Sequence, residues 1–335
     1  MKKYEKVREK ICSCLLDGTL RRGSVVPTER EMAAQLSVSR VTVRNAYSKL
    51  CEAGILTRGR GRAGTRISEN FQGHAKTSRL VAVVSTLQNR FARNFIEAMQ
   101  RQCLDHDLLA VLAVTPERSA EQSEMALGMV TRGIGNLVVW GFGRDLDFQL
   151  FERLRILGVN QVFFDRVAPS GSFADYVSID NQHAVRALLK YAMGAWHPRR
   201  IVGIDIGELE IDSSIERRAE LNAECRKYGL AVDWRLLSWR SSEHDRSILQ
   251  KDLREGDVVF AVNDTMALRV RRCLPKIDIL SVDGTPEAQA ANIVSYHQPI
   301  DRLAETVVAA LLRQRQDGVN WKAGVFRVRG ELTQC

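Results

Sequence analysis

Residues 27–64 read PTEREMAAQLSVSRVTVRNAYSKLCEAGILTRGRGRAG, and this stretch holds the strongest local signals in the chain. Pro27 suits a position at or just before a helix start, and Thr28 with Glu31 can form a capping box. The apolar residues that follow are spaced as on one face of a helix. After a short polar break, Ser39 can cap a second, longer helix. The stretch therefore predicts two helices joined by a tight turn.

The second helix has an apolar inner face and a basic outer face. Its inner positions are Val43, Ala46, Tyr47 and Leu50, and its outer positions include Arg40, Thr42 and Arg44. An arginine near the start of such a helix can hold a guanine edge or a phosphate through two parallel hydrogen bonds. Two short apolar runs then flank the Gly- and Arg-rich residues 58–64, which indicates a β-hairpin wing. A helix-turn-helix with these features predicts DNA binding through the major groove.

The first 67 residues resemble the DNA-binding domain of the GntR family of bacterial transcription regulators. The matching motifs are PTERE, VSRVTVRNAYSKL, AGILT and the Gly-rich wing. The resemblance implies DNA contacts from seven positions: Arg30, Ser39, Arg40, Thr42, Arg44, Arg60 and Gly61. The alternative is an ordinary helical pair beside a solvated basic hairpin. The wing that follows the helices is independent support for the DNA-binding interpretation.

The positive charge of the chain is concentrated at its N-terminal end. Residues 1–70 contain 15 Lys and Arg against 7 Asp and Glu, a net charge of +8, whereas the whole chain carries +9. This asymmetry indicates a nucleic-acid-binding head on a nearly neutral body. We therefore expect a DNA-binding domain at 1–68, a polar linker at 69–78 and a ligand-binding and dimerisation domain at 79–335.

Composition and cysteine usage point to a soluble cytoplasmic protein. The chain is 45% hydrophobic and 27% charged, as is ordinary for globular proteins. It has no apolar run of about 18 residues and no secretory signal pattern, so we expect no contact with membranes. The seven cysteines are scattered without a CxxC pair, which indicates reduced thiols. The histidines show no metal-ligand spacing, and we expect neither a metal nor a cofactor.

The body alternates apolar runs with amphipathic helical patterns. Eight runs are typical of buried strands: Leu80–Val84, Leu108–Val114, Leu137–Trp140, Gln161–Phe164, Ile201–Ile206, Val232–Leu237, Val258–Val262 and Ile277–Val282. Such alternation predicts an α/β fold with parallel sheets. Eight strands could close one barrel or form two doubly wound lobes, and the spacing does not decide between them. No dinucleotide-binding or Walker phosphate loop follows any of these strands.

Five motifs in the body resemble the LacI-type effector domain. They are Phe164-Asp165-Arg166, residues 176–181, Val262-Asn263-Asp264-x-x-Ala267, residues 278–283, and Ser295-x-x-Gln298-Pro299. The resemblance covers about residues 79–330 and implies the fold of periplasmic sugar-binding proteins, with two Rossmann-like lobes, three crossovers and a ligand in the cleft. A GntR-type head on such a body is the arrangement of arabinose-repressor-type regulators.

The same resemblance implies a set of effector-binding residues. Polar contacts are expected from Asp165, Arg218, Asn263, Asp283 and Gln298, and apolar surface from Phe91, Trp140 and Trp239. Arg218 with Asp283 would hold vicinal hydroxyls, or Arg218 would hold a carboxylate or phosphate. The alternative for the Asp and Asn residues is turn and cap chemistry at strand ends, and for the rings it is core packing. The family's glycine after this arginine is missing, because the segment reads Arg218-Ala219-Glu220-Leu221.

These observations predict a ligand-responsive transcription regulator rather than an enzyme. We expect a homodimeric repressor of sugar or glycoside genes whose partners are a two-fold duplex DNA operator and a small-molecule effector, most simply a sugar. A non-sugar effector is one alternative. A pyridoxal-phosphate enzyme-like body is another, but it needs a Schiff-base lysine at a strand end, and the body's lysines fall in helices or polar turns: Lys190, Lys227, Lys251 and Lys276. A purely architectural DNA binder would leave the motifs of the body unexplained.

Overall fold

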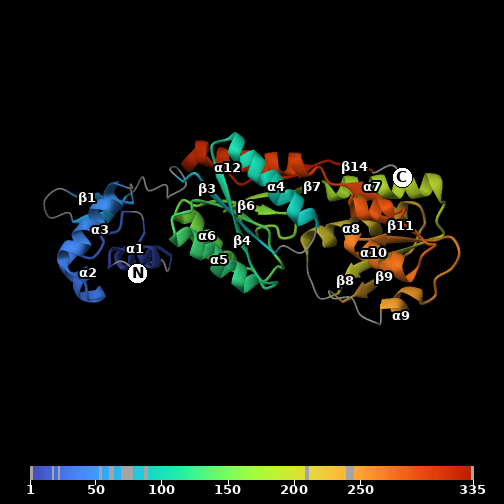
Figure 1. The fold of residues 1–335 in the computed structure, drawn as a ribbon, viewed down its shortest axis with the longest axis horizontal. Coiled ribbons are helices and arrows are strands. Elements are labelled where there is room, and N and C mark those ends of the chain that lie inside the picture. Colours follow the sequence, from blue (N-terminus) through green and yellow to red (C-terminus); the bar gives the residue numbers. More distant parts are fainter. Residues whose placement is uncertain are drawn as a thin grey trace.

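A computed structural model describes most of the chain: residues 3–16, 19–21, 23–52, 55–59, 64–68, 78–86, 90–207, 211–238 and 245–332. Three parts follow one another along its longest axis, a small helical head and then two α/β lobes (Figure 1). The expected linker at 69–78 lies outside the described residues except for Ser78. None of the described helices is both long and apolar enough to cross a membrane.

The head contains the two helices and the hairpin that its sequence predicts, and a further helix precedes them. Its elements are α1 (Lys3–Leu16), α2 (Glu29–Leu36), α3 (Arg40–Glu52), β1 (Leu56–Arg58) and β2 (Thr65–Ile67). The capping box of α2 is formed, since the Thr28 N–H donates to Glu31 Oε2 at 2.8 Å and the Glu31 N–H donates to Thr28 Oγ1 at 3.3 Å. Ser39 caps α3 by accepting from the Thr42 N–H at 3.1 Å. The inner residues predicted for α3 are buried.

The first lobe is built on a six-stranded parallel sheet. Its spatial order is β13-β7-β6-β5-β3-β4. The strands are β3 (Leu80–Ser85), β4 (Leu109–Val114), β5 (Asn136–Val139), β6 (Asn160–Phe164), β7 (Asp175–Ile179) and β13 (Val325–Val328). Its helices are α4 (Arg90–Asp105), α5 (Ser119–Thr131), α6 (Phe148–Ile156) and α12 (Ile300–Asp317). Helix α1 of the head lies beside α6 (Figure 1).

The second lobe repeats this plan with one antiparallel edge. Its order is β14-β12-β11-β10-β8-β9, and only β14 runs against its neighbour. The strands are β8 (Arg200–Ile206), β9 (Val232–Leu237), β10 (Asp257–Ala261), β11 (Asp278–Asp283), β12 (Val294–His297) and β14 (Glu331–Leu332). Its helices are α7 (Asn181–Ala195), α8 (Asp212–Lys227), α9 (Asp245–Gln250), α10 (Asp264–Cys273) and α11 (Pro286–Ala290), and the short helix Gly318–Asn320 follows α12.

The chain crosses between the lobes three times, after β7, after β12 and after β13. Helix α7 follows a strand of the first lobe but packs on the second lobe, against β11, β12 and α8. Helix α12 follows a strand of the second lobe but packs on the first, against α4 and β6. Two doubly wound lobes, rather than one barrel, are therefore the fold of the body.

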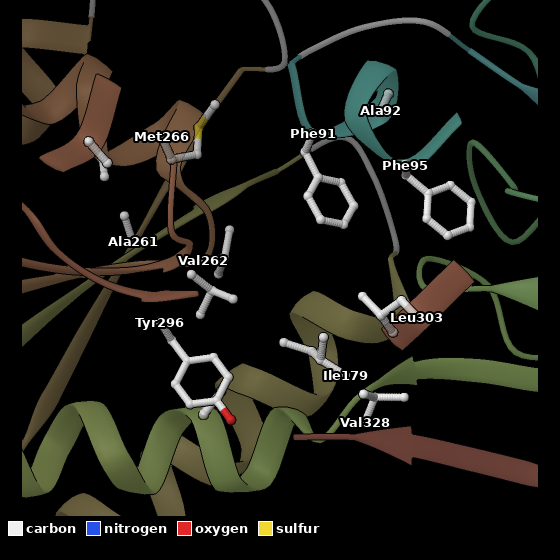
Figure 2. Packing of buried hydrophobic residues seen from close by; sticks show 14 of the residues in the cluster. Phe91, Ala92, Phe95, Ile179, Ala261, Val262, Met266, Tyr296, Leu303 and Val328 are labelled. Atoms are coloured by element: carbon white, nitrogen blue, oxygen red, sulfur yellow. The ribbon is translucent and has the colours of Figure 1, made fainter. Parts of the chain in front are cut away.

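Apolar side chains continue from one lobe to the other. Phe91 and Phe95 of α4 lie on one side of the junction, and Val262, Met266 and Tyr296 of the second lobe lie on the other (Figure 2). Burial of this surface is the main favourable term in holding such elements together. The junction places the carboxyl ends of both sets of strands toward the same space.

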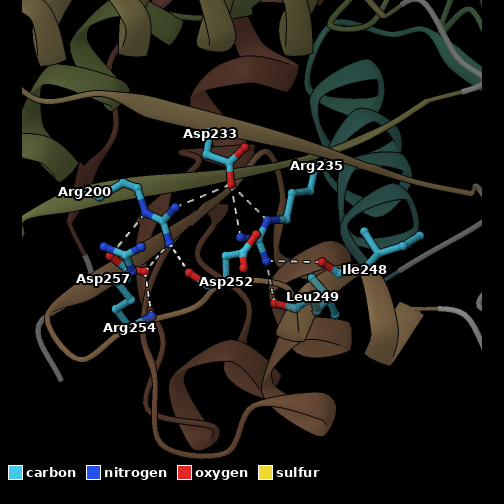
Figure 3. A network of polar contacts seen from close by, with 8 residues as sticks. All are labelled: Arg200, Asp233, Arg235, Ile248, Leu249, Asp252, Arg254 and Asp257. Atoms are coloured by element: carbon cyan, nitrogen blue, oxygen red, sulfur yellow. Dashed lines mark hydrogen bonds and ion pairs between the residues drawn. The ribbon is translucent and has the colours of Figure 1, made fainter.

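A network of charged groups holds elements of the second lobe together at the edge of the sheet where its strands begin. Arg200 donates to Asp257 Oδ2 at 2.5 Å and to the Asp252 carbonyl at 2.6 Å, while Arg235 donates to the Leu249 carbonyl at 2.7 Å (Figure 3). Arg200 and Asp257 stand at the starts of β8 and β10, the edge opposite the carboxyl ends. This network is structural and lies away from the site described next.

Candidate functional site

Four of the residues expected to contact DNA, Ser39, Arg40, Thr42 and Arg44, stand at or near the start of α3. Arg30, Arg40 and Arg44 are exposed, and Ser39 and Thr42 share a hydrogen bond of 2.8 Å between their hydroxyl oxygens. Arg44 Nε lies 3.1 Å from Glu29 Oε2. Arg60 and Gly61 fall outside the described residues. The structure thus describes five of the seven positions, with Arg30 on the first turn of α2 and the other four at or near the start of α3.

Val41 is a feature of this surface that the sequence reasoning missed. Its side chain sits between Arg40 and Thr42 on α3 and is 62% exposed. Single exposed aliphatic groups are common on protein surfaces, but one at the start of this helix is placed for an apolar contact with a thymine methyl group. The signal available in sequence was that Val41 falls off the inner stripe of positions 43, 46, 47 and 50.

A cavity lies between the lobes at the carboxyl ends of their strands. It has about 440 Å³ of empty space, including space open to solvent, and eleven residues line it: Phe91, Trp140, Asp165, Arg166, Ile211, Ser213, Ser214, Arg217, Asn263, Asp283 and Gln298. Trp140, Asp165, Asn263 and Gln298 each follow a strand, and Asp283 ends one. In open α/β sheets this edge is where ligands bind.

Three buried polar atoms in this cavity lack a hydrogen-bond partner among the described residues. They are Trp140 Nε1, Asp165 Oδ1 and Gln298 Oε1. Their residues are only 5%, 8% and 2% exposed. A buried polar atom without a partner costs about 1–3 kcal/mol. One donor and two acceptors are thus available to a bound molecule that carries both hydrogen-bond acceptors and donors.

Asp283 is held in an unusual state beside these atoms. Its φ is 137°, and Gln298 Nε2 donates to its Oδ1 at 2.7 Å. Burial raises the pKa of Asp283 to about 8, the nearby carboxylates of Asp264 and Asp165 act in the same direction, and Arg217 opposes them. The carboxyl group is therefore mostly protonated at neutral pH and can donate as well as accept a hydrogen bond.

Asp264 forms hydrogen bonds that fix the backbone around Asp283. It accepts hydrogen bonds from the Ser281 hydroxyl, from Ser295 Oγ at 2.6 Å, and from the N–H and hydroxyl of Thr285, both at 2.7 Å. Burial raises the pKa of Asp264 despite these bonds. The bonds tie α10 to β11, β12 and the start of α11, so they fix the backbone that carries Asp283.

The expectation that Arg218 lines the cavity is wrong; the neighbouring Arg217 occupies that position. Arg217 is 4% exposed, and it donates to Asn181 Oδ1 at 2.8 Å and to the Val262 carbonyl at 2.6 Å. Arg218 Nη1 instead lies 3.4 Å from Asp205 Oδ2, and its guanidinium stands 5.3 Å from the Trp234 ring. Successive helical residues point about 100° apart, so a one-residue error in register changes the face.

The other expected residues lie as follows. Phe91 and Trp140 line the cavity but also belong to the core, since their rings meet edge to face at 5.6 Å between centroids. Asn263 lines the cavity and caps α10, accepting from the Met266 N–H at 2.9 Å. Trp239 lies outside the described residues. Arg166, which the sequence reasoning did not select, also lines the cavity, and burial lowers its pKa.

Among the described residues, neither lysines nor sets of metal-ligating side chains gather at the cavity. None of its lining residues is a lysine, and Lys227 donates to Glu224 Oε1 at 2.6 Å on the outer side of α8. In the part of the chain that the structure describes, no three His, Cys, Asp or Glu side chains are placed to hold a metal ion together. The cavity can recognise a molecule through hydrogen bonds and ring contacts.

The sequence is similar to those of known regulators over limited stretches. Residues 3–67 match the family of bacterial regulatory proteins, gntR family. The HTH-type transcriptional regulator GgaR of Escherichia coli (strain K12) is 38% identical over 76 residues, 23% of this chain and 30% of GgaR. The arabinose metabolism transcriptional repressor of Geobacillus stearothermophilus is 23% identical over 138 residues, 41% of this chain and 38% of that repressor. The matches thus span about a third of these relatives' lengths.

The body also resembles solved structures. A periplasmic binding protein/LacI transcriptional regulator from Alkaliphilus metalliredigens QYMF, complexed with D-xylulofuranose, superposes with a TM-score of 0.62 at 15% identity. The superposition covers 77% of this chain and 98% of that one. At this level of identity the likeness concerns the fold, and it agrees with the two-lobed architecture described above.

Proposed function

We propose that this chain, which joins a GntR-type winged helix-turn-helix head to a body with the fold of LacI-type regulators, is a transcriptional repressor controlled by a small molecule. The observation that carries this proposal is the group of three unpartnered buried polar atoms in the cavity between the lobes. No described residue forms a hydrogen bond with them, and a bound molecule would satisfy them. The exposed arginines at the start of α3 supply the DNA-binding function.

The effector is best matched by a sugar. A hydroxyl group can both donate and accept, so adjacent hydroxyls would satisfy Asp165 Oδ1, Gln298 Oε1 and Trp140 Nε1 together. Phe91 and Trp140 offer apolar surface to the carbon face of a ring. The regulator that superposes on this body was solved with D-xylulofuranose, and one relative represses arabinose metabolism, which supports the same class.

A homodimer would match a two-fold operator. Recognition helices of such dimers contact half-sites about one helical turn apart. Strand β4 is an edge of the first sheet, carries no charged residue, and leaves Leu109 54% and Val114 49% exposed. Apolar edges of this kind are normally covered. We propose that a second copy covers it, and sedimentation of a purely monomeric chain at all concentrations would refute this.

The first prediction is that DNA binding depends steeply on salt. The net charge of +8 in residues 1–70 lies mostly on the head. Each phosphate that the protein neutralises lowers log K by about 0.9 per tenfold rise in salt. The binding constant K can be measured with the full chain by fluorescence anisotropy of labelled duplex DNA, from low to moderate salt. A plot of log K against the logarithm of the salt concentration should be a straight line with a steep negative slope. An affinity that stays constant would contradict binding through this surface.

The second prediction concerns the cavity. A thermal-shift screen of neutral sugars and sugar phosphates should find a compound that raises the melting temperature of the full chain. Asp165→Ala should then weaken its binding by about 1–3 kcal/mol, because its partner groups lose a buried hydrogen bond. Glu97→Ala, on the exposed side of α4, is the control and should bind as the wild type does. Equal affinity in Asp165→Ala would place the effector elsewhere.

A further inference from the structure

We infer that Asp212 fastens the two lobes together over the cavity, and that losing this contact opens the lobes. Asp212 is the first residue of α8 in the second lobe. Its partners stand on loops of the first lobe: Arg144 follows β5, and Arg166 and Ala168 follow β6. We call these four residues the inter-lobe clasp. The consequence for regulation rests on the proposed function, but the clasp itself does not.

Three contacts make up the clasp. The Ala168 N–H donates to Asp212 Oδ2 at 2.7 Å, and Arg144 Nε lies 3.2 Å from Asp212 Oδ1. The Asp212 N–H in turn donates to the Arg166 carbonyl at 2.8 Å. The Asp212 side chain is 16% exposed, so water screens these contacts only in part. Hydrogen bonds to an ionised carboxylate are about twice as strong as neutral ones.

The clasp is continuous with the walls of the cavity. On the first lobe, Asp165 and Arg166 line the cavity from the same loop that carries Ala168. On the second lobe, Ser213 and Arg217 line it from the same helix that Asp212 begins. The clasp therefore sets the separation of the two walls. A molecule that bridges the walls favours the same closed arrangement, so the clasp and the effector stabilise one state of the body.

Another ion pair between the lobes is weaker because both of its side chains are more exposed to water. Arg90 Nη1 of α4 lies 2.8 Å from Glu287 Oε1 of α11, but the two side chains are 50% and 48% exposed. Exposed pairs of this kind contribute little, because water and salt screen them. Glu216 Oε1 also lies 2.5 Å from Nη2 of Arg327, which belongs to β13, the strand that precedes the last crossing. Because this pair stands next to a chain crossing that joins the lobes, we expect opening of the lobes to separate its two residues least.

The test uses the full chain without ligand. Asp212→Ala removes the carboxylate, and Asp212→Asn keeps its shape while removing its charge. The control is Asp301→Ala, because Asp301 Oδ1 pairs with Arg101 Nη2 at 2.7 Å on the exposed outside of the first lobe alone. Lobe opening is read from acrylamide quenching of Trp140, taken as the difference between proteins with and without Trp140→Phe. Small-angle scattering of the same samples measures the overall dimensions.

We expect Asp212→Ala to shift the equilibrium toward open lobes by about tenfold or more, because hydrogen bonds to a charged group are lost. Quenching of Trp140 and the radius of gyration should rise in Asp212→Ala, rise less in Asp212→Asn, and stay unchanged in Asp301→Ala. If Asp212→Ala does not unfold cooperatively, Arg144→Gln weakens the clasp from the other lobe and should give the same direction of change.

Unchanged quenching and unchanged dimensions in folded Asp212→Ala and Arg144→Gln would overturn the clasp. The proposed function fails by a different measurement. If the variants open but bind operator DNA as tightly as the wild type, the clasp is supported, and what is contradicted is control of DNA binding by lobe closure. Opening together with altered operator affinity supports both.

Discussion

Arg40→Ala is expected to remove most of the preference of this protein for its operator over random DNA. Arg40 begins α3 and is exposed, so the variant loses no core packing. An arginine at this position can contact a guanine edge with two hydrogen bonds, and the loss of such a pair lowers discrimination by about 1–3 kcal/mol per half-site. The measurement is the ratio of dissociation constants for operator and random duplexes at one fixed salt concentration.

The control for this experiment is Lys49→Ala. Lys49 is also exposed and basic but stands in the last turn of α3, away from the helix start. Its loss should weaken binding to both duplexes alike, because a general phosphate contact carries no sequence information. The recognition surface would be misassigned if Arg40→Ala kept the wild-type ratio of the two dissociation constants.

Arg44 is expected to respond less simply than Arg40, because it already has a partner. The contact of Arg44 with Glu29 holds the guanidinium across the two helices in the free protein. A phosphate or base must compete with that carboxylate, so part of the energy of the new contact replaces the old one. This competition is visible only in the folded head, since the two residues are fifteen positions apart.

Asp283→Asn is expected to stabilise the protein at alkaline pH while weakening its binding of effector. Because its folded-state pKa is raised to about 8, chiefly by burial, Asp283 keeps a proton that it loses in the unfolded chain above about pH 4. Stability from this group is therefore present at low pH and is lost as pH rises toward 8. Asparagine avoids this loss, and its Oδ1 can still accept from Gln298.

The melting temperatures of wild type and Asp283→Asn should nearly coincide at about pH 4 and diverge progressively up to about pH 8. Each pH unit in this window is worth up to about 1.4 kcal/mol. Asp257→Asn is a control in which the pKa shift has the opposite direction. Burial raises the pKa of Asp257, but hydrogen bonds from Arg200 and from the Arg254 N–H outweigh burial and lower it. That variant should be less stable than wild type at neutral pH. Parallel pH profiles for Asp283→Asn and wild type would show that Asp283 is ionised in the folded state.

A gain in stability together with a loss of binding would mark Asp283 as a residue kept for function. A half-buried, mostly neutral carboxyl group beside three buried polar atoms that no described residue partners is an unfavourable arrangement for stability alone. Sites for ligands commonly carry such penalties, because their groups are arranged for the bound state. Calorimetry with the compound found by the screen would measure the lost affinity.

Much of the fold follows from short-range signals that the sequence carries openly. The capping box at Thr28 and the inner stripe of α3 involve residues a few positions apart, and both are present in the structure. The eight predicted apolar runs all coincide with strands. Six of these strands are buried along most of their length, as inner strands of parallel sheets must be, and the other two, β4 and β9, are partly exposed edge strands. The family resemblances supplied what periodicity left open, namely two lobes rather than one barrel.

Strands whose polar residues have distant partners were missed. Strand β7 is buried throughout yet begins with Asp175, which accepts from Arg313 Nη2 at 2.5 Å and from the Gly324 N–H at 2.7 Å. These donors are 138 and 149 positions away, so nothing near Asp175 in the sequence shows that it can be buried. Strands β12, β13 and β14 were missed too, since they are short and mixed in polarity.

The sequence by itself determined the helix-turn-helix of the head, the alternation of strands and helices, and most residue types of the cavity, because these depend on local spacing and on motifs. Only the tertiary structure decided that Arg217 rather than Arg218 faces the cavity, which atoms there lack partners, and that Asp212 joins the lobes. Each of these depends on the direction in which a side chain points and on neighbours that are distant in the sequence. Burial and electrostatics act through space, and the order of residues along the chain does not record those distances.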